Sequence, residues 1–279
     1  MHELNRTSLT RYASTIADLS GVARPQSADE PLLWVEDVLT DVCKKPFDRV
    51  FIQNPDCCAQ WLYQKYPDAI EPVLKHTQVT VPFQTVMPSV TPVCFATMYT
   101  GALPSVHGIR KYEKPIVKTD SLFDSWIKAG KKVCLVSTTT ASMSNIFKDR
   151  DFDIINCTVD GETQEGMAIQ KVQDIILEDK YDVVIFYSWM YDTMDHKYGP
   201  ESKEALTALY RQSSAFDMLV STIKRYWTDH NTLISFSTDH GCHKSVPCAE
   251  NKFHEGDHGT DSPLDLNILH FLGAIPASS

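Results

Sequence analysis

Five short apolar runs, separated by polar residues and helical patterns, constrain the fold of this chain more than any other feature. Each run is rich in β-branched or aromatic side chains and bounded by charged or polar residues, as expected of strands buried on both faces. The runs are residues 49–53 (RVFIQ), 132–137 (KVCLVS), 153–156 (DIIN), 182–187 (DVVIFY) and 232–237 (TLISFS). Helical patterns lie between them at 120–129, 162–177 and 204–226. This alternation predicts an α/β fold, with a mostly parallel central sheet and helices on both faces.

The first 45 residues have a different pattern. Residues 9–16 have the composition of a short helix, and apolar residues recur at helical spacing over 31–45, which predicts an amphipathic helix. We therefore expect an N-terminal helical appendage over residues 1–45 and one α/β domain over residues 46–279.

The charge of the chain limits its partners. With 36 acidic and 26 basic residues, the net charge is −10. This excess argues against a nucleic-acid backbone binder, which needs a basic surface. It is compatible with a cation site, although solubility alone also explains it. No stretch reaches the ~18 consecutive apolar residues of a membrane span, so no membrane partner is expected. The sequence carries no signal for an oligomeric state.

The eight cysteines are scattered, without a C-x-x-C pair, and residues 1–19 lack the apolar segment of a signal peptide. In a chain with these properties we expect reduced, mostly buried thiols and a cytoplasmic location.

Acidic residues follow three of the five predicted strands. Asp56 follows the first run, Asp192 the fourth, and Asp239 with His240 the fifth. In an open parallel sheet, ligands bind outside the carboxyl ends of the strands. These side chains are therefore predicted to share one edge of the sheet.

Two of these positions have further potential metal ligands nearby. Asp192 and His196 are four residues apart, on one face of a helical turn, and His254 and His258 follow the fifth run. Carboxylates together with imidazoles suit Zn²⁺ or a similar first-row metal. Taken alone, an Asp/His pair is commonly a surface hydrogen bond, and a DHG sequence a turn. Three such clusters at one sheet edge favour cations, because burying carboxylates without them is costly.

Thr91 stands immediately before Pro92, where a helix is predicted to begin. A hydroxyl there would lie beside unpaired backbone N–H groups that can receive a phosphate or sulfate oxygen. The alternative is that Thr91 is only the N-cap of that helix.

Four motifs occur in the order found in a known enzyme family. They are TGALPSVHGI at 100–109, DTMDHKYGP at 192–200, TDHG at 238–241 and HG at 258–259. Together they resemble the alkaline phosphatase superfamily, most closely its type I phosphodiesterase/nucleotide pyrophosphatase branch, over about residues 49–279. The nucleophilic threonine of that family lies nine positions before the first motif, which corresponds to Thr91.

The resemblance implies two divalent cations, Zn²⁺ with Mn²⁺ as the alternative, bound by two sets of side chains. One set is Asp192, His196 and His258, and the other is Asp56, Asp239, His240 and Thr91. It also implies that residues 46–279 form a catalytic domain. This domain would hydrolyse a small phosphate ester or nucleotide-like substrate through a phosphothreonine on Thr91.

The chain departs from the family pattern at two positions. The first aspartate of the family usually precedes a glycine, whereas Asp56 precedes Cys57. Nucleotide pyrophosphatases of the family carry Asn three residues after the nucleophile, where this chain has Cys94. A phosphomonoesterase of the same superfamily and a non-catalytic metal-binding module are therefore the alternatives. A sulfatase is disfavoured, because the residues from Thr91 onward do not match C/S-x-P-x-R.

Several polar residues beside the motifs receive weaker predictions. His254 is the alternative to His258 as the third imidazole ligand, and His107 is expected to be a structural residue of its loop. Those expected to be solvated near the mouth of the site are Asp195, His243, Lys244 and His254.

Overall fold

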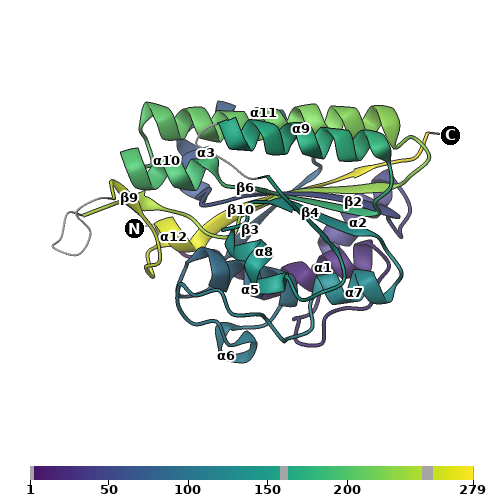
Figure 1. Cartoon of the computed structure of the whole chain (residues 1–279), viewed down its shortest axis with the longest axis horizontal. Coiled ribbons are helices and arrows are strands. Elements are labelled where there is room, and N and C mark those ends of the chain that lie inside the picture. The colour runs from purple at the N-terminus through teal and green to yellow at the C-terminus, as the bar shows by residue number, and fades with distance from the viewer. Residues whose placement is uncertain (1–2, 158–162, 247–253, 279) are drawn as a thin grey trace.

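The computed structural model describes residues 3–157, 163–246 and 254–278 of the chain. Its centre is an eight-stranded sheet with the strand order β1-β3-β10-β7-β2-β6-β4-β5. All neighbouring strands are parallel except at β10, which runs antiparallel to both β3 and β7. Helices lie above and below this sheet (Figure 1). The predicted fold class, a mostly parallel α/β sheet with helices on both faces, is confirmed.

All five predicted strands are present, and three further strands join them. The predicted strands are β2 (Arg49–Pro55), β4 (Val133–Ser137), β5 (Asp153–Asn156), β6 (Val183–Ser188) and β7 (Thr232–Ser237). The additional ones are β1 (Thr7–Ser8), β3 (Val79–Gln84) and β10 (Asn267–Ile275). The two longer strands, β3 and β10, were not predicted from the sequence. Pro82 lacks the backbone N–H that a strand residue usually donates, and His270 and Gly273 interrupt the apolar run of β10. A two-stranded sheet is formed by β8 (His243–Lys244) and β9 (Gly256–Asp257).

One layer of helices covers the upper face of the sheet in Figure 1. It includes α3 (Gln60–Lys65), α4 (Glu71–Leu74), α9 (Thr163–Glu178), α10 (Met190–Tyr198) and α11 (Lys203–Tyr226). A 3₁₀ turn, Pro67–Ala69, joins α3 to α4. The long α11 packs along α9, α10 and α4, so it holds this layer together.

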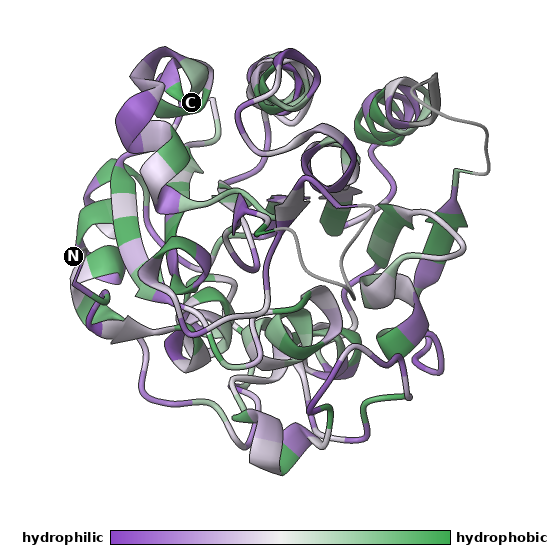
Figure 2. Cartoon of the chain, turned by 90° about the vertical axis from the view of Figure 1, so that its left-hand side faces the viewer, coloured by the Kyte–Doolittle hydropathy of each residue, from purple (hydrophilic) through white to green (hydrophobic). Residues whose placement is uncertain are grey.

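The other layer covers the lower face. It includes α1 (Tyr12–Leu19), α2 (Leu33–Val42), α5 (Thr91–Thr100), α7 (Leu122–Lys128) and α8 (Ser142–Phe147). Short helices lie at Leu9–Arg11, at Pro104–His107 (α6) and at Pro263–Leu266 (α12). Figure 2 shows the resulting layers end on, with the sheet between the helices.

Alternate side chains of each central strand pack into two separate hydrophobic cores. Val50 and Ile52 of β2 and Ile185 of β6 lie in the lower core, whereas Phe51 and Val184 lie in the upper core. All five are fully buried. Burying one such side chain contributes about 1.5–3 kcal/mol, so the central strands are fixed in register from both faces.

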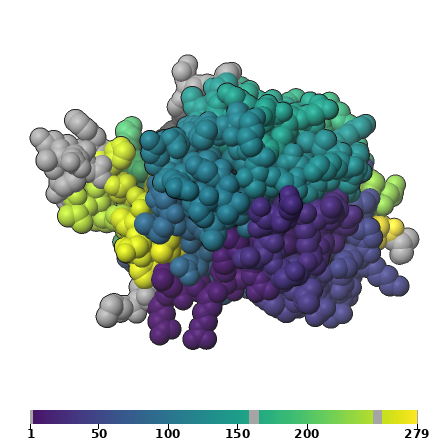
Figure 3. Space-filling view, turned by 90° about the horizontal axis from the view of Figure 1, so that it is seen from below, coloured from purple at the N-terminus to yellow at the C-terminus, as the bar shows by residue number. Residues whose placement is uncertain are grey.

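The first 45 residues pack closely onto the rest of the chain. Strand β1 pairs with β3, and the buried Tyr12 and Ile16 of α1 and Leu39 of α2 belong to the lower core. From below, this segment (purple) lies beside the blue and teal residues that follow it (Figure 3). The helices expected here are present, and they share a core with residues 46–279. The boundary at residue 45 between two functional units stays a prediction.

The described cysteines carry free thiols, five of them buried, and Cys248 lies outside the described residues. Within the described ranges, none of the helices combines the length and apolar character that crossing a bilayer requires. The cytoplasmic location stays a prediction.

Helix α5 ends at a glycine for which there is no room for a side chain. Gly101 has φ +67°, and an added Cβ would lie 2.4 Å from both Cα and Cβ of Ala28 and 2.8 Å from the Thr10 carbonyl oxygen. Gly108, which ends α6 at φ +89°, has open space at the same position. Alanine substitution at the two glycines can therefore distinguish the destabilisation caused by a left-handed backbone from the destabilisation caused by a steric clash.

We expect Gly101→Ala to lower the free energy of unfolding by about 3 kcal/mol, because a left-handed alanine and a backbone clash add together. Gly108→Ala should cost only about 1 kcal/mol, from the backbone alone. Urea unfolding of both variants measures the difference, and equal losses would contradict the packing of α5 against residues 10 and 28.

Candidate active site

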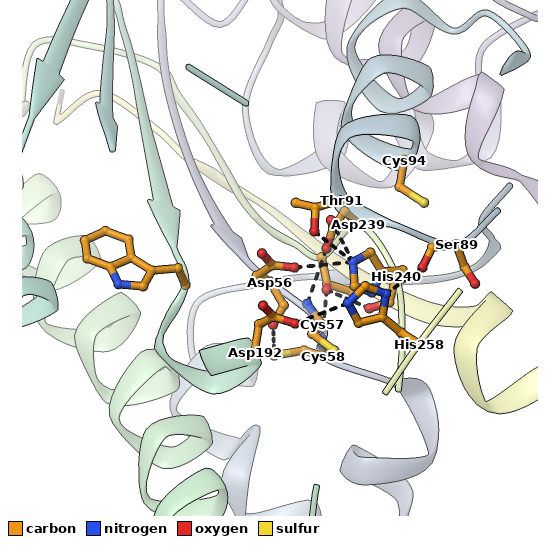
Figure 4. Close-up of polar contacts among 12 residues, drawn as sticks. Asp56, Cys57, Cys58, Ser89, Thr91, Cys94, Asp192, Asp239, His240 and His258 are labelled. Atoms are coloured by element: carbon orange, nitrogen blue, oxygen red, sulfur yellow. Dashed lines mark hydrogen bonds and ion pairs between the residues drawn. The ribbon is translucent and has the colours of Figure 1, made fainter. Parts of the chain in front are cut away.

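The three predicted acidic positions converge at the carboxyl ends of three adjacent central strands. Strands β7, β2 and β6 are neighbours in the sheet, with Gln53 of β2 opposite Phe236 of β7, and Pro55 opposite Ser188 of β6. Asp56 follows β2 directly, α10 with its aspartate follows β6, and the Asp-His pair follows β7. Figure 4 shows these side chains pointing toward one another.

Asp56, Asp239 and His240 form one group of potential ligands, whose donor atoms all lie within 4.8 Å of one another. The Nε2 atom of His240 lies 3.5 Å from Oδ1 of Asp56 and 3.4 Å from Oδ2 of Asp239. All three residues are at most 1% exposed.

Asp192, His196 and His258 form the second group, within the same 4.8 Å limit. Asp192 Oδ1 lies 3.4 Å from Nε2 of His196, one turn further along α10, and 3.5 Å from Nε2 of His258. The His258 and His240 rings have centroids 4.1 Å apart, so the two groups are adjacent. The structure thus brings together both predicted sets of side chains, and their role as ligands stays a prediction.

Backbone carbonyls orient all three imidazoles. The Nδ1 atoms of His196, His240 and His258 lie 3.0–3.1 Å from the carbonyl oxygens of Gly256, Gly241 and Ser89, respectively. Because Nδ1 must carry a proton to donate to a carbonyl, each neutral ring presents the Nε2 lone pair to the site. Hydrogen bonds of this kind commonly fix metal-binding imidazoles.

The carboxylates have high electrostatic energy in this arrangement. Three oxygens, Asp56 Oδ1, Asp192 Oδ1 and Asp239 Oδ2, are buried and have no hydrogen-bond partner among the described residues. Burial and the charge of Asp239 raise the pKa of Asp56 well above its usual value, and burial raises the pKa of Asp239 to about 7. Burial, reinforced by the neighbouring His240 imidazole, lowers the pKa of His258 to about 4.

Three unpartnered carboxylate oxygens beside imidazole Nε2 atoms fit divalent cations. A cation between them would supply the positive charge that the buried carboxylates lack. Mixed nitrogen and oxygen donor sets of this size suit Zn²⁺.

Thr91 is the first residue of α5, and its hydroxyl faces the ligand groups (Figure 4). Thr91 Oγ1 lies 3.3 Å from Nε2 of His240. The N-cap residue is Val90, so the alternative reading of Thr91 as an N-cap is wrong. The expected cradle of free amides is also reduced. Pro92 has no N–H, and the amides of Val93 and Cys94 each donate to the Val90 carbonyl at 3.0 Å.

Cys57 takes the conformation usual for the glycine that it replaces. Its φ is +67°, in the left-handed region that glycine adopts without strain. Its backbone N–H donates to Asp239 Oδ1 at 3.3 Å. The local chain path therefore needs no glycine, and Asp56 still points into the site.

Cys94 does not take over the position of the missing asparagine. Its buried sulfur lies 3.8 Å from the Val86 carbonyl and 4.0 Å from the Pro88 carbonyl. In Figure 4 it points away from the ligand groups.

Sequence reasoning missed two residues that support the site. Tyr187, the fifth residue of β6, donates its hydroxyl hydrogen to Asp56 Oδ2. Glu165 of α9 accepts hydrogen bonds from Ser188 Oγ at 2.7 Å and from the first amide of α10, that of Met190, at 3.1 Å. Tyr187 could have been suspected from the sequence, because a tyrosine near the carboxyl end of a strand lies beside the predicted ligands. Glu165 lies in a helix with no motif, so nothing in the sequence marks it.

One residue expected to be solvated is instead buried. Asp195 is 0% exposed, because the side chain of this α10 residue points inward. His254 is exposed, and its ring centroid lies 4.7 Å from that of His196 with the two rings tilted by 43°. His243 is hydrogen-bonded to Asp265 through Nδ1 at 2.7 Å.

The family to which the chain belongs follows from comparison with known proteins. The family model for type I phosphodiesterase/nucleotide pyrophosphatase matches residues 118–261, just over half of the chain, so the chain belongs to that family. It is a family of phosphoric ester hydrolases in the alkaline phosphatase superfamily. No curated protein sequence matches the chain significantly.

Solved structures share the fold. Murine ectonucleotide pyrophosphatase/phosphodiesterase 5 is similar with a TM-score of 0.59 at 14% identity, over 81% of this chain and 88% of that chain. The human protein of the same name gives 0.62 at 13% identity, over 81% and 87%. Phosphonoacetate hydrolase from Sinorhizobium meliloti gives 0.54 at 15% identity, over 74% of this chain and 59% of that chain.

His107, at the end of α6, is held neutral by burial, and its hydrogen bonds fix which ring nitrogen carries the proton. Its Nδ1 accepts from the Ile109 N–H at 3.2 Å, so its Nε2 carries the proton that faces Thr97 Oγ1 at 3.1 Å. Burial lowers the pKa of His107 from 6.5 to about 4. The expected structural role in the loop is consistent with these contacts.

The depressed pKa of His107 predicts a loss of stability in mild acid. Below pH 6.5 the unfolded chain gains a proton at His107 that the folded chain does not take up until about pH 4. Stability present above pH 6.5 is therefore lost as the pH falls. Between pH 7 and pH 5 this residue should cost about 2 kcal/mol. Urea unfolding of His107→Gln should show a smaller fall over that interval, and an equal fall would contradict the neutral histidine.

Proposed function

We propose that the chain is a phosphodiesterase or nucleotide pyrophosphatase that works through a phosphothreonine on Thr91, with two divalent cations. The observation that carries this proposal is the position of the Thr91 hydroxyl. It lies 3.3 Å from an imidazole of one ligand group, and that group directly adjoins the second. A nucleophile beside two cation-binding groups is the arrangement that phosphoryl transfer requires.

The proposed cation sites follow the two groups. Asp56, Asp239 and His240, together with Thr91, would hold one cation, and Asp192, His196 and His258 the other. Zn²⁺ is the proposed ion, with Mn²⁺ as the alternative. When bound, such cations lower the pKa of a nearby hydroxyl or water and neutralise developing charge on phosphate oxygens.

The proposed hydrolysis has two steps, both of which take place at Thr91. Thr91 Oγ1 loses its proton to solvent and attacks phosphorus in line, and the bond to the leaving oxygen breaks on the opposite side. The leaving oxygen takes up a proton, which gives a phosphothreonine and an alcohol from a diester, or a phosphate from a pyrophosphate. Water then attacks the same phosphorus, which releases the phosphate product and restores the hydroxyl. Tyr187 and Glu165 position the machinery, since they bind Asp56 and the start of α10.

Small phosphate esters are the proposed substrates. An inactive threonine-to-alanine variant of murine ectonucleotide pyrophosphatase/phosphodiesterase 5 was solved in complex with AMP. The bacterial phosphonoacetate hydrolase was solved with phosphonoacetate. Both ligands support a site for a compact phosphorus-containing anion in this chain, and a nucleotide-like diester is the substrate class that the family favours.

We expect Thr91→Ala to lose at least about 10³-fold in kcat, because it removes the nucleophile. It should keep the same number of cations per chain as the wild-type protein, since the aspartates and histidines remain. Thr91→Ser is the matched control and should retain partial activity. The measurements are hydrolysis of bis-p-nitrophenyl phosphate and p-nitrophenyl phosphate with added Zn²⁺ or Mn²⁺, and elemental analysis. Near-normal turnover by Thr91→Ala would show that the nucleophile is elsewhere.

His258 and His254 offer a matched test of the third imidazole. His258→Ala should lower the metal content by about one cation per chain relative to the wild-type protein, and the activity by at least about 100-fold. His254→Ala should leave the metal content unchanged, because this ring is exposed and does not belong to the group formed by Asp192, His196 and His258. Elemental analysis of the dialysed variants decides between them, and the reverse outcome would assign the ligand to His254.

A further inference from the structure

A third cluster of metal-binding side chains lies beside the two already described. Donor atoms of Cys57, Asp195 and Cys242 all lie within 4.8 Å of one another, and all three residues are 0% exposed. None of the three belongs to the proposed catalytic groups.

The cluster joins the three segments that carry the proposed catalytic ligands. Cys57 directly follows Asp56, and Asp195 lies on α10 between Asp192 and His196. Cys242 stands two residues after His240. A cation bound by these three side chains would therefore connect the chain segments that follow β2, β6 and β7.

Asp195 is under-satisfied in this position. Its Oδ1 has no hydrogen-bond partner within the described part of the chain, and its Oδ2 has a long contact of 3.9 Å with Cys57 Sγ. A Cβ added at Gly256 would lie 2.0 Å from the same Oδ1, so the fold leaves space for this carboxylate only by having glycine there. A buried carboxylate normally has a stronger partner than a thiol.

The presence of cysteine at position 57 also calls for a reason. A non-glycine residue at φ +67° is disfavoured by about 1 kcal/mol or more, and glycine would remove that cost. What cysteine adds is a sulfur, directed toward Asp195 and 3.7 Å from the Gly241 carbonyl oxygen.

We propose that Cys57, Asp195 and Cys242 bind a third divalent cation, a structural Zn²⁺, next to the catalytic pair. Two thiolates and a carboxylate form a donor set for which Zn²⁺ is the fitting ion. The Gly241 carbonyl oxygen is placed to complete four-fold coordination. On binding, each thiol gives up its proton to solvent and the carboxylate binds as the anion. The three negative ligands and the divalent cation together leave the site with a single negative charge. The cation fixes the segments that hold the catalytic ligands.

Cobalt provides a test that does not depend on activity. Co²⁺ bound to thiolate absorbs strongly in the near ultraviolet through sulfur-to-metal charge transfer, whereas the proposed catalytic groups contain only oxygen and nitrogen donors. The full-length protein, reconstituted with Co²⁺, should bind about three cations per chain and show this absorption. Cys242→Ser and Cys57→Gly should each lose one cation and at least half of the absorption.

Two further variants make the test specific. Asp195→Asn, which preserves side-chain shape, should weaken the third cation at least tenfold in a competition titration with a chelator. Cys134→Ser, at a buried thiol in β4, should leave both cation content and absorption unchanged. His258→Ala should lose a catalytic cation but keep the absorption, so that failure of the catalytic assignment and of this one are distinguished.

Two outcomes would overturn the proposal. One is the absence of sulfur-to-cobalt absorption in the wild-type protein when Co²⁺ is in excess. The other is absorption that survives Cys242→Ser but disappears in both Cys57→Gly and His258→Ala. Cys57 also lies within 4.8 Å of His240 and His258, so that result would place its sulfur on a catalytic cation.

Discussion

The buried carboxylates at the ends of β7, β2 and β6 are the constraint on which the rest of the site depends. Like charges held this close in a low-dielectric interior repel one another, and they remain ionised only if positive charge lies between them. The parallel sheet imposes the proximity, because neighbouring strands end at the same edge. The imidazoles are oriented by hydrogen bonds to backbone carbonyls, and together with the carboxylates they form two adjacent sets of metal-binding donors.

Much of this arrangement could be predicted because it depends on local patterns. The five predicted strands, the i,i+4 pair on α10 and the Asp-His pair after β7 are all visible as short sequence signals, although β5 lies at the edge of the sheet and is not buried on both faces as predicted. The insertion of β10 between β3 and β7 was not visible, since antiparallel pairing at that position depends on distant partners. The burial of Asp195 was missed for the same reason: the sequence gives the face of a helix, but not what packs against it.

The two departures from the family pattern have different physical meanings. Cys57 shows that a motif glycine can be replaced when the backbone tolerates a left-handed residue and the new side chain has somewhere to go. Cys94 shows a true loss, since its sulfur is directed to backbone carbonyls and away from the site. The backbone path at the first departure is thus retained, whereas at the second the side chain no longer faces the ligand groups.

The antiparallel strand β10 has a consequence for synthesis on the ribosome. Strand β3, which leads to the helix of Thr91, is hydrogen-bonded to β1 on one side and to β10 on the other, and only β10 connects it to β7. In a nascent chain that has not yet released residues 267–275, β3 therefore lacks its hydrogen-bonded link to β7 and to the strands beyond it. The strand that leads to Thr91 is thus incorporated into the sheet only after β10 has been synthesised.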